Sequence, residues 1–215
     1  MITHRASAFA PWALLLLLLP FNTVADDLIS AIQAGDRNAA DRQLSEGADP
    51  NTATGDGEFA GKTALMWAAE TGDRELSRLL LDAGAEVDAR NPKGGTALMY
   101  AAVNGHASVI RVLVDAGADA RHEVSNGWSP LMLAAAKGHA AGARELVGRG
   151  ADPDSRDVYG WTPLMRAVHN GHREMVETLI DLGADTAISD GNGVTARVIA
   201  ESTGRKDLAR LLETD

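Results

Sequence analysis

Two histidines, His169 and His172, have the spacing that most readily suggests chemistry in this sequence. Imidazole nitrogens are common zinc ligands, and two histidines a few residues apart on a helix belong to several zinc sites. A tetrahedral site needs three or four converging ligands, however, and no third ligand is evident. The turn expected at Gly171 also separates the two side chains. We therefore expect no metal and no other cofactor.

A catalytic site is not expected either. Cysteine is absent, serines are few, and the chain contains no nucleophile elbow, zinc-protease helix or phosphate-binding glycine loop. No nucleophile stands beside a base in a recognisable motif. The sequence therefore predicts a protein that is not an enzyme.

The histidine pair lies in a phrase that recurs every 33 residues. The copies begin at Gly61, Gly94, Gly127, Gly160 and Gly193 and read GKTALMWAAETGD, GGTALMYAAVNGH, GWSPLMLAAAKGH, GWTPLMRAVHNGH and GVTARVIAESTGR. A second series, Gly-Ala-Asp or Gly-Ala-Glu, begins at Gly84, Gly117, Gly150 and Gly183. A degenerate copy at 27–49 precedes its successor by 37 residues, so four extra residues are expected in the first connecting loop. The repeat explains the histidines structurally.

Each copy predicts a pair of helices followed by a hairpin. A threonine before the apolar run, such as Thr63, is a typical helix N-cap, and Pro163 suits the first turn. Gly72 and its counterparts allow the left-handed turn that ends the first helix. An apolar segment such as 109–114 predicts the second helix. Because one pair cannot bury its apolar face alone, neighbouring pairs must stack.

This period and pattern resemble the ankyrin repeat from about Asp26 to the C-terminus. The resemblance implies an all-α solenoid of helix-turn-helix units with β-hairpin fingers. In the last copy Arg197 replaces a leucine, as suits a terminal repeat that needs a polar outer face. We assign 26–60 to an N-terminal cap repeat and its long loop, 61–93, 94–126, 127–159 and 160–192 to full repeats, and 193–215 to a C-terminal cap repeat.

Residues 1–25 have the pattern of a secretory signal peptide. Arg5 precedes an apolar run that contains six consecutive leucines, and Pro20 ends the run. Thr23-Val24-Ala25 then provides residues that signal peptidase accepts, which predicts cleavage after Ala25. An uncleaved anchor is the alternative, although the run is shorter than the roughly 20 residues that span a bilayer. The whole chain resembles bacterial exported ankyrin proteins, so we expect a periplasmic location without stable membrane insertion after cleavage.

The charge excludes some partners. The chain has 20 Lys and Arg against 30 Asp and Glu, and cleavage would remove Arg5 and no acid, which leaves a formal charge of −11. Nucleic-acid binding needs clustered cations, so no nucleic-acid partner is expected. The charge favours solubility and a neutral or basic partner.

The resemblance implies that another protein binds the concave face, which is lined by finger residues and the ends of the first helices. The chain is expected to be a monomer when unbound, and the sequence does not identify the partner. Trp, Tyr and Arg are favoured at interface hot spots, although the tryptophans could instead only pack neighbouring fingers. Carried over position by position, the partner-binding residues are Phe59, Lys62, Lys93, Trp128, Lys137, Arg156, Tyr159, Trp161 and His169.

The sequence allows two alternative functions. The protein could be an inhibitor or immunity-type protein whose acidic surface occludes an exported enzyme or toxin. It could also buffer oxidants or a soft metal through the column Met66, Met99, Met132 and Met165, which replaces the histidine usual in the family. The competing interpretation of the column is adaptable packing between repeats.

One segment is expected to open before the others. In the fourth copy, Gly142 and Ala143 occupy positions where the neighbouring repeats have larger apolar residues. Glycine inside a helix costs about 1 kcal/mol relative to alanine, and apolar area is lost as well. We predict that 139–147 exchanges its amide hydrogens faster than the other full-repeat second helices, as measured by hydrogen–deuterium exchange. Finding it the best protected of them would contradict the prediction.

Overall fold

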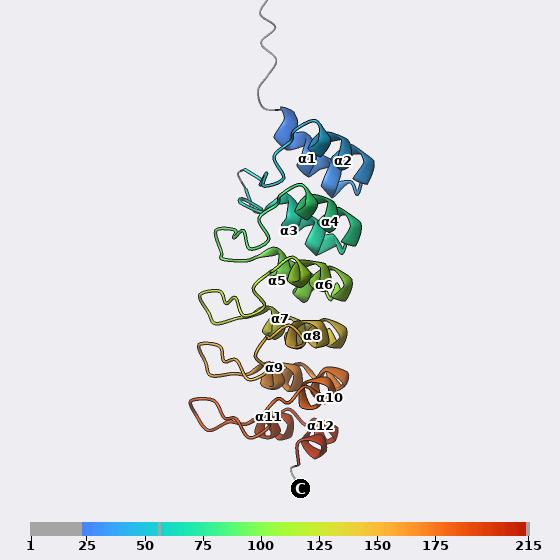
Figure 1. The fold of residues 1–215 in the computed structure, drawn as a ribbon. Helices are drawn as coiled ribbons and strands as arrows, with labels where there is room; N and C mark the ends of the chain where they lie inside the picture. Colours follow the sequence, from blue (N-terminus) through green and yellow to red (C-terminus); the bar gives the residue numbers. More distant parts are fainter. Residues whose placement is uncertain (1–22, 56, 214–215) are drawn as a thin grey trace, which may run out of the picture.

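The computed structural model describes residues 23–55 and 57–213, and these residues form twelve α-helices in six successive pairs (Figure 1). In chain order the helices are α1 (Thr23–Gln33), α2 (Arg37–Ser45), α3 (Ala64–Thr71), α4 (Arg74–Asp82), α5 (Ala97–Val103), α6 (Ala107–Asp115), α7 (Pro130–Lys137), α8 (Ala140–Val147), α9 (Pro163–Asn170), α10 (Arg173–Asp181), α11 (Ala196–Ser202) and α12 (Lys206–Leu211). Apart from two isolated bridges, the described residues contain no β-structure. The fold is therefore all-α, as the sequence predicts.

The predicted signal peptide lies mostly outside the described residues. The description begins at Thr23, the first residue of α1, and leaves out 1–22. Cleavage after Ala25 would remove the first three residues of this helix. Among the helices of 23–55 and 57–213, none has both the length and the apolar character needed to cross a bilayer.

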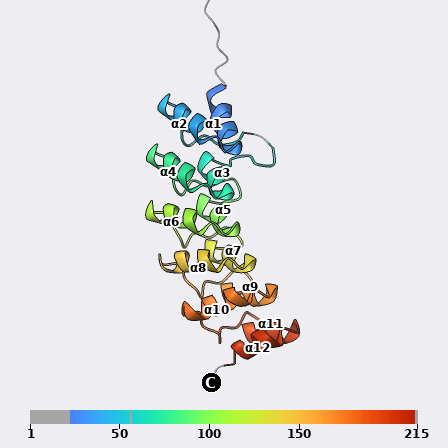
Figure 2. The ribbon, with the colours of Figure 1, turned by 90° about the vertical axis from the view of Figure 1, so that its right-hand side faces the viewer.

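The helix pairs stack one on another along the array (Figures 1 and 2). The odd-numbered first helices α1 to α11 pack against one another in sequence, and the second helices α4 to α12 do the same. The loops that join successive pairs project beyond the first helices and form the fingers (Figure 1). Fingers, first helices and second helices thus make three layers, which is the solenoid that the sequence predicts.

The first helices after α1 begin at the same kind of cap. The side-chain oxygens of the capping residues accept hydrogen bonds from the backbone N–H three residues later, at 3.2–3.4 Å. Such bonds satisfy N–H groups that a helix cannot pair internally. The capping residues are Thr63, Thr96, Ser129, Thr162 and Thr195.

A glycine in one repeat and a histidine in the next hold neighbouring repeats together. The Nε2 atoms of His106, His139 and His172 donate to backbone carbonyls at the end of the preceding first helix, at 2.9–3.1 Å. Each ring also lies against the glycine that ends that helix. At Gly105, where φ is +77°, an added Cβ would lie 2.6 Å from the His139 Nδ1 atom. At the last joint Arg205 replaces histidine and donates in the same way.

The methionine column lies in the core between repeats. Met66, Met99, Met132 and Met165 are all buried. Val198 has the same register in the last repeat, where no further pair stacks on it, and it is 43% exposed. The following repeat therefore buries each methionine, which favours the packing interpretation.

The ends and the fourth copy have particular packing. Arg197, which replaces a leucine in the last repeat, is exposed and its Nε bonds to Glu201 Oε1 at 2.9 Å. Gly142 in α8 is buried, and an added Cβ would lie 2.9 Å from Ile110 Cδ1 in α6. The missing side chain therefore lets these two helices approach closely. Whether this segment opens first stays a prediction.

The glycine–histidine contact leads to a test with a matched control. Replacing Gly105 by alanine combines an unfavourable positive φ with a clash against His139, so we predict a loss of about 2–3 kcal/mol in the free energy of unfolding. Gly117→Ala has a similar backbone conformation (φ +95°) and no atom within 4 Å of the added Cβ, so it should cost only about 1 kcal/mol. Urea unfolding followed by circular dichroism measures both. Equal losses would show that the ring contact adds nothing.

Candidate partner-binding surface

The fingers are closed by one repeated hydrogen-bond pattern. In the second finger (91–95), the Asn91 N–H donates to the Gly95 carbonyl at 3.0 Å, and the Gly94 N–H donates back to Asn91 at 2.8 Å. The third (124–128), fourth (157–161) and fifth (190–194) fingers repeat the first of these bonds at 3.0–3.1 Å. In the first finger, Thr54 and Lys62 take the corresponding positions. The four extra residues of the first loop therefore lie in the tip of this finger.

Asparagine or aspartate stabilises three of these tips. Oδ1 of Asn91, Asp157 and Asp190 accepts two backbone N–H bonds from the residues two and four positions later, at 2.8–3.0 Å. The backbone N–H of Val194 is the main reason that the pKa of Asp190 is lowered. Val124 replaces this residue in the third finger, where Asn126 instead accepts from the Trp128 N–H at 3.1 Å. The tips therefore present their side chains from ordered backbone.

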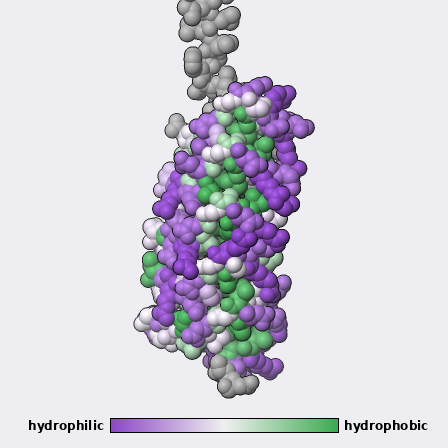
Figure 3. All heavy atoms as spheres, in the orientation of Figure 1, coloured by the Kyte–Doolittle hydropathy of each residue, from purple (hydrophilic) through white to green (hydrophobic). Residues whose placement is uncertain are grey.

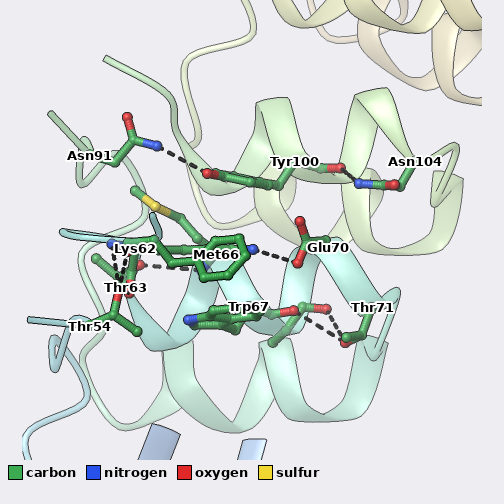
Figure 4. Close-up of polar contacts among 12 residues, drawn as sticks. Thr54, Lys62, Thr63, Met66, Trp67, Glu70, Thr71, Asn91, Tyr100 and Asn104 are labelled. Atoms are coloured by element: carbon green, nitrogen blue, oxygen red, sulfur yellow. Dashed lines mark hydrogen bonds and ion pairs between the residues drawn. The ribbon is translucent and has the colours of Figure 1, made fainter. Parts of the chain in front are cut away.

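Lys62 lies inside an aromatic cluster that spans two repeats (Figure 4). Its Nζ is 3.6 Å from the ring centroid of Trp67, 4.5 Å from that of Tyr100 and 5.5 Å from that of Phe59. Nζ also forms an ion pair with Glu70. Cation–π contacts are worth about 2 kcal/mol when they are desolvated, so the rings and the carboxylate together offset the cost of burying the ammonium. We call these five residues the Lys62 cluster.

The Lys62 cluster changes the role expected for its central residue. Lys62 is 1% exposed, so its ammonium is not at the surface, whereas Phe59 at the finger tip is 50% exposed. Burial raises the pKa of the Tyr100 hydroxyl, and the Asn91 amide nitrogen donates to that hydroxyl at 3.1 Å. Lys62 therefore organises the surrounding surface rather than forming it.

A second cation–aromatic cluster lies toward the other end of the array. The guanidinium carbon of Arg166, in α9, is 4.5 Å from the Trp161 ring centroid and 4.9 Å from that of Trp128. Arg166 also forms an ion pair with Asp157, whose side chain is completely buried. The Trp161 ring meets His169 edge-on at 5.4 Å between centroids. We call these five residues the Arg166 cluster.

Arg166 is not among the site residues predicted from the sequence, although the repeat period contains a signal for it. Its counterparts at 33-residue intervals are Trp67, Tyr100 and Leu133. Two of these counterparts contact finger residues, which marks the column as one that faces the fingers. Arg166 is a cation in that column and follows Trp161 closely in the sequence. This position indicates a contact with the tryptophans of the fingers.

The remaining predicted site residues are exposed to different degrees. Lys93, Lys137, Arg156 and His169 are exposed, and Trp128 and Trp161 are partly buried. Tyr159 and its neighbour Val158 form the tip of the fourth finger and are 70% and 62% exposed. We use the name finger face for the surface made by the fingers and the first helices. A hydrophobic stripe runs down the array over the helices, with hydrophilic residues on both sides (Figure 3).

A pocket of about 260 Å³ opens in the finger face between the second and third fingers. Tyr100 and Trp128, one from each cluster, contribute to its walls. We call it the central pocket, and its lining residues are Asn91, Lys93, Gly95, Met99, Tyr100, Val103, Val124, Asn126, Trp128 and Leu133.

The two histidines of the opening motif have separate contacts. The His172 ring bonds to the Ala136 carbonyl of the preceding repeat at 3.1 Å, whereas the His169 ring contacts Trp161. Within 23–55 and 57–213, no three His, Cys, Asp or Glu side chains converge in a way that could hold a metal ion.

The stacked helix pairs, glycine turns and fingers define a helical-repeat solenoid. A family model described as ankyrin repeats (3 copies) matches residues 28–124 and 116–190, which together are more than half of the chain. The chain belongs to the ankyrin-repeat family. No curated protein matches it. Ankyrin repeats generally mediate protein–protein interaction, and proteins built from them are typically non-catalytic scaffolds.

The buried ion pair gives a prediction for stability. Arg166→Ala leaves the Asp157 carboxylate buried with only its two backbone donors, so we predict a loss of about 3 kcal/mol in the free energy of unfolding. In an Asp157→Asn background, which retains an acceptor for those donors, the same change should cost about 1 kcal/mol. Urea unfolding of the four proteins in this double-mutant cycle measures the coupling. A coupling near zero would contradict the role given to the pair.

Proposed function

We propose that this chain is a non-catalytic interaction protein that binds a partner protein through its finger face after export to the periplasm. The observation that carries the proposal is the ordered aromatic surface of this face. Arg166 holds Trp128 and Trp161 in place, and the fourth finger beside them exposes Val158 and Tyr159. Aromatic residues and arginine are enriched in protein interfaces and dominate their hot spots. The proposed location rests on the predicted signal peptide and the resemblance to bacterial exported ankyrin proteins.

The distribution of charge supports a partner surface that is close to neutral. The finger side, made of 54–72, 88–104, 121–137, 154–170 and 187–203, has eight basic and nine acidic residues. The rest of the chain from residue 26 has 11 basic and 21 acidic residues, so it carries nearly all the net charge. An inhibitor that covers a basic site by charge would therefore use the second-helix side. Binding at the finger face should depend only weakly on salt.

The methionine alternative has less support. A Cu(I) ion or a soluble oxidant reaches a thioether only where sulfur is accessible, and the four methionines of the column are at most 5% exposed. Uptake at these sites would require neighbouring repeats to separate.

The experiment combines export with partner capture. The full-length chain, tagged at its C-terminus, is produced in a Gram-negative bacterium, the cell fractions are separated, and its N-terminus is sequenced. We expect a periplasmic product that begins at residue 26 and retains a specific protein from periplasmic extract. A Trp128→Ala/Trp161→Ala variant should lose at least about tenfold of that capture, since each hot spot is worth about 2 kcal/mol.

The matched control changes two exposed residues on the other side of the array. An Asp115→Ala/Arg149→Ala variant removes a surface ion pair between α6 and the end of α8, and it should bind as the unchanged chain does. Circular dichroism confirms that both variants are folded. Equal capture by the tryptophan variant would reject the finger face as the binding surface, and a cytoplasmic product with an intact N-terminus would reject export.

A further inference from the structure

The central pocket lies between the Lys62 cluster and the Arg166 cluster. In these two clusters the cation and the aromatic rings come from opposite kinds of element. In the Lys62 cluster the cation comes from a finger and two of the rings come from first helices. In the Arg166 cluster both tryptophan rings come from fingers and the cation comes from a first helix. Between them, Gly95 and Leu133 occupy the two positions from which a cation could come, and neither has one. The chain's own cations therefore contact the Tyr100 and Trp128 rings from the two sides, and neither of the two intervening positions places a cation in the pocket.

The floor and walls of the pocket are apolar. Met99, Val103, Val124 and Leu133 line it together with the rings of Tyr100 and Trp128. Its volume of about 260 Å³ is below the range of roughly 300–1,000 Å³ that is usual for small-molecule sites. A single apolar side chain fits this space better than a metabolite does.

The polar groups of the pocket are donors. Oδ1 of Asn91 and Oδ1 of Asn126 already accept backbone N–H bonds, and the Tyr100 hydroxyl accepts from the Asn91 amide nitrogen. Within the described part of the chain, no hydrogen bond or ion pair joins the Lys93 ammonium, the Asn126 amide nitrogen or the Tyr100 hydroxyl hydrogen to an acceptor. No aspartate or glutamate lines the pocket, although acids outnumber bases in the sequence. Donors with a positive charge complement a carboxylate.

We propose that the central pocket receives an apolar side chain of the partner protein, and that an aspartate or glutamate next to that side chain binds Lys93. This inference rests on the proposed function and specifies its chemistry. The partner segment crosses the finger face with its apolar side chain between Tyr100 and Trp128. Because Lys62 and Arg166 hold these two rings in place, the pocket exists before the partner binds, which lowers the ordering cost of binding.

The test uses short peptides rather than the unidentified partner. The ¹⁵N-labelled chain, expressed from its full sequence and purified in its exported form, is titrated by NMR with an N-acetylated, C-amidated glycine-phenylalanine-aspartate-glycine peptide. One control peptide replaces the aspartate by asparagine, and another replaces the phenylalanine by alanine. We expect the first peptide to shift the amide signals of pocket residues with a Kd in the millimolar range. The asparagine peptide should bind about fivefold more weakly, and the alanine peptide should not saturate.

Three variants of the chain test which residues of the pocket contact the peptide. Lys93→Gln should abolish the difference between the aspartate and asparagine peptides, whereas Lys137→Gln, an exposed lysine on α7 that does not line the pocket, should preserve it. Leu133→Glu places a carboxylate in the partly buried wall and should remove binding of the aspartate peptide. Chemical shifts far from the pocket confirm that each variant keeps the fold.

The possible results separate this inference from the proposed function. Shifts confined to the pocket, with the stated order of affinities, support the inference. Equal binding of the aspartate and asparagine peptides, or shifts elsewhere, would overturn it even if a partner is captured through Trp128 and Trp161. If the peptides bind as predicted but no partner protein is captured, the result would support the pocket and would contradict only the proposed function.

Discussion

The contact of a histidine ring with a glycine of the preceding repeat is the constraint on which the rest of the structure depends. The glycine ends a first helix with a positive φ, and its missing Cβ leaves the space that the ring of the next repeat occupies. The same ring donates to a carbonyl of that helix end. Steric fit and hydrogen bonding therefore impose one register at each histidine joint. Gly35 and Gly204, at the two ends, keep the positive φ but have no side chain against them.

The register of the repeats determines what the finger face can hold. Lys62 contacts rings from two successive repeats, and Arg166 contacts rings from the third and fourth fingers. Neither cluster could form within one repeat. The two clusters therefore form only when the repeats stack. A change at a glycine–histidine contact, away from the finger face, would alter the spacing of these rings. Because the two cations are already paired with Glu70 and Asp157, the donors of the apolar pocket between them are the ones that we propose for partner binding.

The sequence predicts those features that recur. The 33-residue period predicts the helix pairs, the threonine and serine caps, the glycine turns and the extra residues in the first finger, since each follows from local backbone chemistry repeated in one column. The burial of Lys62 does not recur. It depends on rings at positions 59, 67 and 100, which come from successive repeats and meet only when those repeats stack. Position-by-position reasoning places Lys62 at the surface because it treats each column alone. The same limit applies to the Arg166 cluster and the central pocket, both of which form only between repeats.

The last described repeat has a face that differs from the stacked faces of the other repeats. Val198 has the register of the buried methionines and still offers an apolar side chain toward the end of the stack, whereas Arg197 beside it carries a charge and bonds to Glu201. The last described repeat thus exposes Val198 and a charged Arg197 at the two positions where the full repeats bury a methionine and a leucine. One substitution at the same register therefore makes this face partly polar while the helix pair beneath it keeps its fold.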